Sequence, residues 1–264
     1  MKLFAKLFVL VALTINIAFL CGCSTVPYTD RSRILLTGEN EENNLGLDAW
    51  QKMLAEGKMS SNVKQNGALL RIGSNISAVA GKPDYKWEFR VFVNPQANAF
   101  CLPGGKVGVT SSLFEYTAND AELATVVGHE IGHAIARHGG ERMSHGIMQQ
   151  IGSEAVSYGT QEPMFVTAFG LISHVGGVLP YSRVHEYEAD HIGLILMAKA
   201  GYNPRAALSF WKKFGKGGTD QRLMELLSTH PMSKKRLLEM EILQKKAWEY
   251  YNKAPRKHGF GEKL

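Results

Sequence analysis

The sequence predicts an α+β fold that is predominantly helical, with a small β-sheet or hairpin next to one central helix. Apolar residues recur at helical spacing over residues 39–55 and 63–79, and a glycine follows each stretch. Over residues 86–93 the pattern changes to an alternation of apolar and polar side chains, which indicates a strand. Helical patterns return after residue 119, so the strands occupy one short section of the chain.

A predicted hairpin completes the sheet. Residues 98–102 and 106–110 favour extended structure, and Pro103-Gly104-Gly105 between them is typical of a turn. The hairpin comes shortly before the central helix in the sequence, so we expect the sheet to lie next to that helix.

The central helix has a clear start. Asn119 is a favourable N-cap, and Glu122 follows three residues later, as in a capping box. We expect the helix to run from Asp120 to about His138, where Gly139-Gly140 would end it.

The remaining chain is predicted to be mainly helical. Residues 141–179 are interrupted by glycines, and we interpret them as a core helix followed by a mobile flap. Further helices are predicted over residues 182–201, from Pro204 onward, and over residues 233–251, where Ser233 can act as the cap. Residues 255–264 form a predicted basic tail.

Length and composition set broad limits. The chain has 264 residues, of which 45% are hydrophobic and 20% charged, as expected for one globular domain, here over residues 39–254. The net charge of +6 is not gathered beside aromatic residues, so we expect no nucleic-acid partner. Only Cys101 lies outside the N-terminal segment, and we expect it to be a buried small side chain.

Residues 1–22 have the layout of a secretory signal, with a basic start and an apolar run. Leu20-Cys21-Gly22-Cys23 resembles a bacterial lipobox, which implies cleavage before Cys23 and acylation of that residue. The pattern with Ser24 resembles an outer-membrane address in a Gram-negative bacterium, and residues 23–38 would be the lipidated tether. A retained anchor helix is the alternative.

The central helix carries the motif H-E-x-x-H. His129 and His133 are four residues apart, so they project from one face of the helix and can bind the same zinc ion. Glu130 lies beside that metal, where it can take a proton from a bound water and pass it to a leaving amine. Two structural histidines are the alternative interpretation.

Two glycines support the catalytic interpretation. Gly128 and Gly132 each cost the helix about 1 kcal/mol relative to alanine. We expect this cost to be offset by the close approach of another backbone, as a metal cleft would require.

A catalytic zinc usually has three protein ligands. Ala136 and Gly139 exclude the metzincin arrangement, in which these positions are Gly and His. Glu186 is the favoured third ligand, because Asp190 follows four residues later and can accept a hydrogen bond from a ligand histidine. His185 is the competing candidate.

The combined motifs resemble the Oma-type and CAAX-prenyl-protease-like zinc peptidases over roughly residues 38–250. The matching sequences are H-E-x-x-H, E-x-E-A-D-x-x-G from Glu186, Asn98-Ala99 with Pro103-Gly104-Gly105, and Ser228-Thr229-His230-Pro231 with Arg236. By layout, the chain is most similar to small bacterial lipoprotein peptidases of the outer membrane. From its pattern we expect neither the several spanning helices of some relatives nor the C-terminal helical repeats of others.

The resemblance implies a zincin-like catalytic domain with one Zn²⁺ per chain, bound by His129, His133 and Glu186. It implies that His230 and Arg236 stabilise the oxyanion, or that His230 occupies the open zinc position in a resting form. It also implies that the strand around Asn98 and Ala99 holds an extended substrate by strand addition.

Four other residues are expected to have lesser roles. His138 and His145 lie off the ligand face or beyond the predicted helix end, and we expect them at the surface or behind the ligands. His174 is interpreted as a core histidine and Glu188 as an acid on a helix surface.

The resulting hypothesis is a zinc endopeptidase, lipid-anchored on the periplasmic side of the outer membrane, that cuts unfolded or misassembled envelope proteins. The metal and reaction come from the residues, whereas the quality-control role comes from the resemblance alone. The alternative is a zinc-stabilised, chaperone-like or binding lipoprotein with a latent active site.

Overall fold

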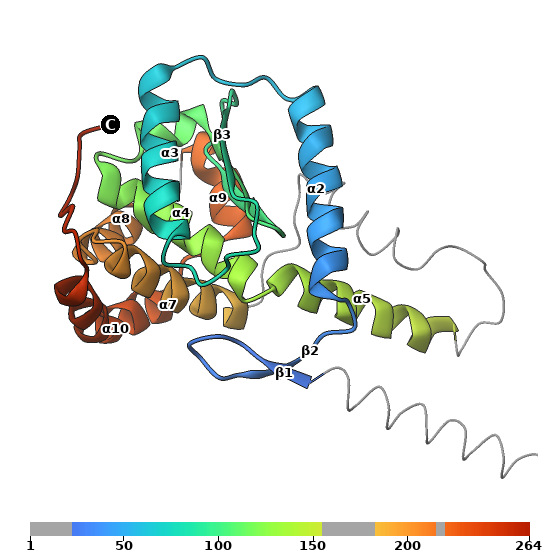
Figure 1. Cartoon of the computed structure of the whole chain (residues 1–264). Coiled ribbons are helices and arrows are strands. Elements are labelled where there is room, and N and C mark those ends of the chain that lie inside the picture. Colours follow the sequence, from blue (N-terminus) through green and yellow to red (C-terminus); the bar gives the residue numbers. More distant parts are fainter. Residues whose placement is uncertain (1–22, 155–182, 215–219) are drawn as a thin grey trace, which may run out of the picture.

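The computed structural model describes residues 23–154, 183–214 and 220–264, and it confirms a mainly helical α+β fold with a small sheet (Figure 1). The predicted signal and most of the predicted flap, including His174, lie outside these residues. The described helices are α2 (Glu39–Glu56), α3 (Val63–Ser77), α4 (Asp120–Ile135), α5 (His138–Glu154), α7 (Arg183–Lys199), α8 (Arg205–Phe214), α9 (Met224–Thr229) and α10 (Lys234–Lys253). Short 3₁₀ turns cover Ser111–Glu115 and Gln221–Leu223.

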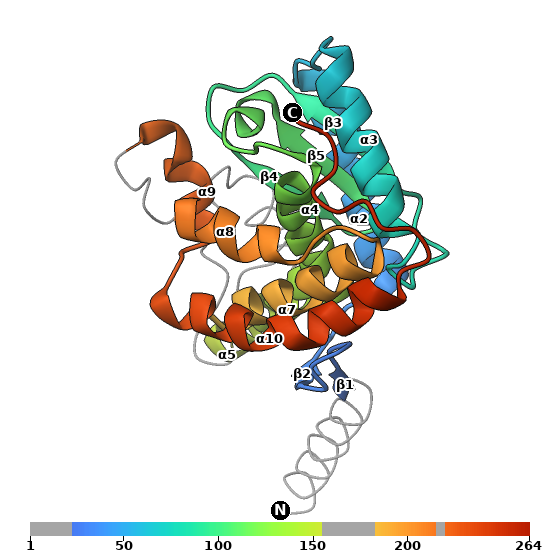
Figure 2. The ribbon, with the colours of Figure 1, turned by 90° about the vertical axis from the view of Figure 1, so that its left-hand side faces the viewer.

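The main sheet has three strands in the order β3-β5-β4, formed by Glu88–Phe92, Lys106–Thr110 and Ala99–Leu102. β4 and β5 are the two arms of the predicted hairpin and pair antiparallel, with Ala99 opposite Val109. β3 pairs parallel with the other side of β5. β5 is thus the central strand, and β4 lies at an edge of the sheet. Figure 2 shows the sheet at one end of the molecule, with α4 between it and helices α7 and α10.

α4 begins as predicted but ends earlier. The Asn119 side chain accepts a hydrogen bond from the Glu122 amide, and the helix continues to Ile135. Arg137 then adopts a positive φ of 51°, and α5 starts at His138. The prediction that Gly139-Gly140 would end the helix is therefore wrong.

Contacts with α2 account for this early turn. The Arg137 guanidinium donates to the buried carboxylate of Glu42 at 2.7 and 3.0 Å and to the Thr37 carbonyl oxygen at 2.8 Å. Gly140 lies inside α5, at a position where a Cβ would collide with the Glu42 carboxylate. The glycine therefore allows α5 to approach Glu42 of α2 closely. The ion pair between Arg137 and Glu42 fixes the turn.

The glycines of α4 face α7, and the expected close backbone approach is present. A Cβ on Gly128 would lie 3.0 Å from the Gly193 carbonyl oxygen, and one on Gly132 would lie 2.9 Å from the Ala189 carbonyl oxygen. α7 can therefore pack directly against α4 with backbone near backbone. This packing brings the first turn of α7 beside the motif on α4.

Both terminal segments are more ordered than the predicted tether and tail. Within residues 23–38, β1 (Cys23–Thr25) and β2 (Ser32–Ile34) form an antiparallel hairpin that lies below α5 and α7 in Figure 1. Within residues 255–264, the carbonyl oxygens of Phe260 and Glu262 accept hydrogen bonds from the first amides of α4. Both segments thus pack against the rest of the described domain. No described helix is long and apolar enough to cross a membrane.

Candidate active site

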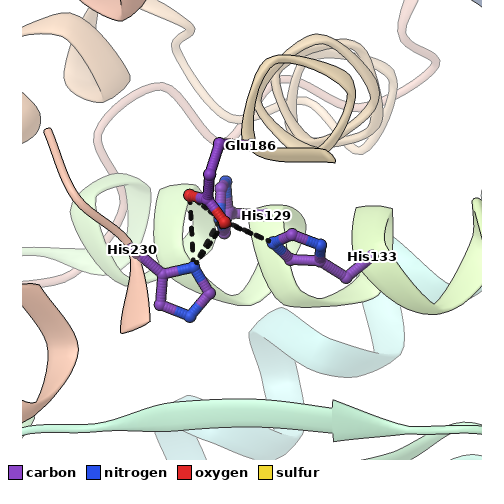
Figure 3. A group of neighbouring side chains, drawn as sticks. All are labelled: His129, His133, Glu186 and His230. Atoms are coloured by element: carbon purple, nitrogen blue, oxygen red, sulfur yellow. Dashed lines mark hydrogen bonds and ion pairs between the residues drawn. The ribbon is translucent and has the colours of Figure 1, made fainter. Parts of the chain in front are cut away.

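Four buried side chains converge between α4, α7 and the end of α9 (Figure 3). His129 and His133 project from α4, Glu186 comes from the first turn of α7, and His230 directly follows α9. The Nε2 atom of His129 lies 3.1 Å from His133 Nε2 and 3.2 Å from His230 Nδ1. The Glu186 carboxylate lies 3.1 to 3.5 Å from all three rings. The structure therefore gathers the three predicted ligands and His230 at one point.

The donor set fits a tetrahedral metal ion. Zinc bonds of about 2.0–2.1 Å to nitrogen and oxygen imply a separation of about 3.3–3.4 Å between neighbouring donors. The five distances given above, from 3.1 to 3.5 Å, bracket that value. Three imidazoles and one carboxylate also match the ligands that zinc prefers. These four residues could hold one zinc ion or a similar divalent metal.

His129 is oriented from behind by Asp190. The Asp190 carboxylate lies 2.9 Å from His129 Nδ1, so this nitrogen donates and Nε2, which faces the other donors, is the atom that can bind a metal. Burial alone would lower the pKa of His129, but Asp190 and Glu186 outweigh it and raise the pKa to about 10. A metal ion at Nε2 would replace the proton that these carboxylates otherwise favour.

Glu130 lies next to the four donors and is 2% exposed. Its Oε1 atom has no hydrogen-bond partner among the described residues, and the nearest imidazole nitrogen, His230 Nε2, is 3.4 Å away. Burial raises the pKa of Glu130, only partly countered by His230 and His129. A buried carboxylate with an unused oxygen and a raised pKa is suited to accept a proton from a water molecule at the donors.

The arrangement agrees with the comparison of this chain with known protein families. The model described as Peptidase family M48 matches residues 63–243, well over half of the chain, and this range contains all the residues described above. The chain belongs to peptidase family M48.

Three M48 relatives show how far the similarity extends. The mitochondrial metalloendopeptidase OMA1 of Schizosaccharomyces pombe is 33% identical over 224 residues, which are 82% of this chain and 65% of that protein. The protein of the same name from Arabidopsis thaliana is 46% identical over 150 residues, 57% of this chain and 30% of its own. The beta-barrel assembly-enhancing protease of Yersinia pestis is 30% identical over 178 residues, 63% of this chain and 36% of its own. This chain thus spans 30–65% of the length of these relatives. The family resemblance expected from the motifs is confirmed.

In this M48 chain, Arg236 lies behind the ligands. Its guanidinium donates to both oxygens of Asp190 at 2.7 and 2.8 Å, lies 2.8 Å from Glu186 and also donates to the Pro231 carbonyl oxygen. The ring of Trp211 packs against both Arg236 and His129. The geometry favours a role in positioning Glu186 and Asp190 over the direct oxyanion contact that the resemblance implied.

Two residues lie behind His133: His138, in the second of its two expected positions, and Glu188, which was expected at a helix surface. His138 is fully buried, and its Nδ1 atom lies 2.7 Å from His133 Nδ1, because the turn at Arg137 directs the ring back toward α4. Glu188 is 4% exposed and lies 3.0 Å from His138 Nε2, so it is not a helix-surface acid. Burial lowers the pKa of His138 to about 4, against the opposing effect of Glu188, and the ring is neutral at pH 7.

The remaining predicted residues lie apart from the four donors. His185 contacts the Glu141 carboxylate at 3.1 Å and is not among the four clustered donors. Asn98 donates to Glu225 at 2.7 Å and immediately precedes edge strand β4, which begins at Ala99. β4 packs against α4, the helix that carries Glu130, and its partly buried Cys101 has a thiol pKa raised by burial. Cys23 is the first residue of β1.

Proposed function

We propose that this chain is a zinc-dependent endopeptidase that cleaves unfolded or misassembled proteins. The observation that carries the proposal is the buried group of His129, His133, Glu186 and His230, with the unpartnered Glu130 oxygen beside it. A structural metal site would not require a second buried carboxylate beside the donors, with an oxygen that accepts no hydrogen bond.

Each side chain then has a separable task. When bound, zinc would polarise a peptide carbonyl and lower the pKa of a water molecule to about 7. Glu130 accepts the proton of that water and delivers it to the leaving amine. Asp190 keeps His129 in the tautomer that binds metal, and Arg236 holds Asp190 and Glu186 in place. His230 faces Glu130 through Nε2 and the metal donors through Nδ1, so it can contact a developing oxyanion if its ring turns away from the donors.

Substrate binding by strand addition follows from the edge position of β4. An extended peptide beside Ala99–Leu102 would pair with backbone groups that β5 does not use, and such pairing depends little on side-chain identity. This mode suits unfolded segments of many sequences. It also requires the segment to leave its own fold, which would protect folded proteins.

The site of action we propose is the periplasmic face of the outer membrane, with Cys23 acylated. The lipobox-like sequence supports the anchor, and the similarity to the Yersinia pestis protease named for β-barrel assembly supports a role with envelope proteins. Mass spectrometry of the N-terminal peptide tests the anchor, because acylation would shift its mass and Cys23→Ser would abolish the shift.

The variant Glu130→Gln tests the catalytic assignment. It should bind zinc like the wild type but lose cleavage of unfolded casein, because the four donors remain and the base does not. Glu249→Gln, at an exposed position on α10, is the matched control and should cleave normally. Full proteolysis by Glu130→Gln would refute the assigned role.

One observation favours a second candidate, a binding lipoprotein with a latent site. His230 lies close enough to act as a fourth donor, which would leave no position for water. His230→Ala distinguishes the two functions. A faster initial cleavage of casein would mean that His230 blocks an enzyme, and slower cleavage would mean that it takes part in the reaction. Absence of cleavage by both proteins would favour the binding function.

A further inference from the structure

The N-terminal hairpin places the Arg31 side chain against two carboxylates inside the domain. We propose that Arg31 is a positioning residue that fixes the orientation of the metal-site residue His133 through Glu188 and His138. The inference rests on the proposed metal site and concerns a part of the chain outside the range matched by the family model.

Arg31 is held by two carboxylates at once. Its guanidinium donates to Glu188 at 2.7 and 2.9 Å and to Glu141 at 2.8 and 2.6 Å. The side chains of both acids are only 5% exposed. Removing Arg31 would take away a cation that compensates each of these nearly buried negative charges. Thr29 in the same hairpin turn donates a further hydrogen bond to Glu188 at 3.0 Å. Glu188 therefore depends on the hairpin for its position and its charge compensation.

Two successive hydrogen bonds connect Glu188 with His133 through His138. A carboxylate only accepts hydrogen bonds, so His138 must donate to Glu188 through Nε2. The Nε2 atom of His133 faces the other donors, so in the metal-binding form of the ring the proton lies on Nδ1, which donates across the 2.7 Å contact to His138 Nδ1. The Nε2 atom of His133 is thereby left with a lone pair directed at Glu186 and His129. Glu188 thus selects the tautomer of His133 that can bind a metal.

The two α4 ligands are supported in matching ways. Asp190 orients His129 directly and is held by Arg236 from α10. Glu188 orients His133 through His138 and is held by Arg31 from the hairpin. Residues that orient ligand histidines typically change metal affinity or activity by about 10- to 100-fold when they are replaced. Because Arg31 acts through two intermediates, we expect an effect near the lower limit of this range.

The contact between Arg31 and Glu188 depends on the position of the hairpin formed by β1 and β2. β1 begins at Cys23, and the turn is closed by hydrogen bonds between Val26 and both Arg31 and Asp30. A displacement of this hairpin would withdraw Arg31 from Glu188. The position of the segment next to the proposed anchor is therefore coupled to the metal site.

Competition with a zinc chelator measures the dissociation constant for Zn²⁺ in the full chain and in Arg31→Gln. We expect about tenfold weaker binding in Arg31→Gln, a changed absorption spectrum when Co²⁺ replaces Zn²⁺, and partial recovery in Arg31→Lys. Arg33→Gln is the matched control, because Arg33 belongs to the same hairpin and donates to Ser24 without contacting Glu188. Its zinc affinity should stay within about twofold of the wild type.

A double-mutant cycle separates positioning from general destabilisation. In a His138→Ala background, Arg31→Gln should change zinc affinity by less than about twofold, because the connection to His133 is already cut. Equal losses in both backgrounds would overturn the inference, as would wild-type affinity in Arg31→Gln. A wild-type chain that binds no zinc would instead overturn the proposed function, and this inference with it.

Discussion

Replacing Gly193 with alanine should force α7 away from α4 and disturb the metal site. A Cβ at position 193 would lie 2.7 Å from the carbonyl carbon of Gly128 and 2.7 Å from the amide nitrogen of His129. Ordinary contact begins at 3.4 Å, so the difference, 3.4 − 2.7, requires the backbones to separate by roughly 0.7 Å. Because metal–ligand distances are held within about 0.2 Å, Glu186 on α7 could no longer complete the site formed by α4.

The expected magnitudes follow from two opposing effects. Overpacking a core costs about 1–3 kcal/mol, and alanine returns up to about 1 kcal/mol of helix propensity. Gly193→Ala should therefore lower the free energy of unfolding by up to about 2 kcal/mol in urea titrations, and weaken zinc binding at least tenfold.

Gly67 in α3 provides the matched control for this substitution. It is exposed, and a Cβ there would meet no atom within 4 Å. Gly67→Ala should leave zinc affinity unchanged and stabilise the protein by up to about 1 kcal/mol. If Gly193→Ala were as stable as Gly67→Ala and bound zinc like the wild type, the argument from close packing would be refuted.

Two further predictions concern charges behind and below the site. Asp190→Asn should weaken zinc binding by about 10- to 100-fold, because it removes the carboxylate that orients His129 and pairs with Arg236; unchanged affinity in chelator competition would contradict this role. Burial would raise the pKa of Glu141, but the hydrogen bonds from Arg31 and His185 hold it well below its ordinary value of 4.5. This ion pair therefore contributes stability above pH 4.5 that is lost as the pH falls. In urea titrations, the free energy of unfolding of Glu141→Gln should decrease less steeply from about pH 5 to pH 3 than that of the wild type. Equal slopes would contradict the assignment.

The sequence predicted the α4 part of the site because its signals are local. The capping residue Asn119, the i, i+4 spacing of the two histidines and the glycines at 128 and 132 all act within one helix. Glu186 was predicted from its i, i+4 spacing to Asp190 on a second helix. The structure places both carboxylates beside His129.

The residues behind His133 escaped prediction because their positions depend on tertiary contacts. The turn at Arg137 is fixed by Glu42, a residue far away in sequence, and Gly139-Gly140 offered a more familiar helix stop. With the helix extended to His138, that side chain lay off the ligand face, so a position at the surface and one behind the ligands both stayed open. Glu188 had no visible partner, because Arg31 lies in a segment that resembled a linker. The only sequence signal available was a second acid near Glu186, which is not specific.

The most direct test of the account is the metal content of the purified full chain beside that of Glu186→Ala. We predict about one zinc ion per wild-type chain and much weaker binding by the variant, because Glu186 supplies a buried donor from α7 to the three histidines. Absence of zinc from the wild type, or equal zinc affinity in both proteins, would contradict the ligand assignment and the proposed reaction.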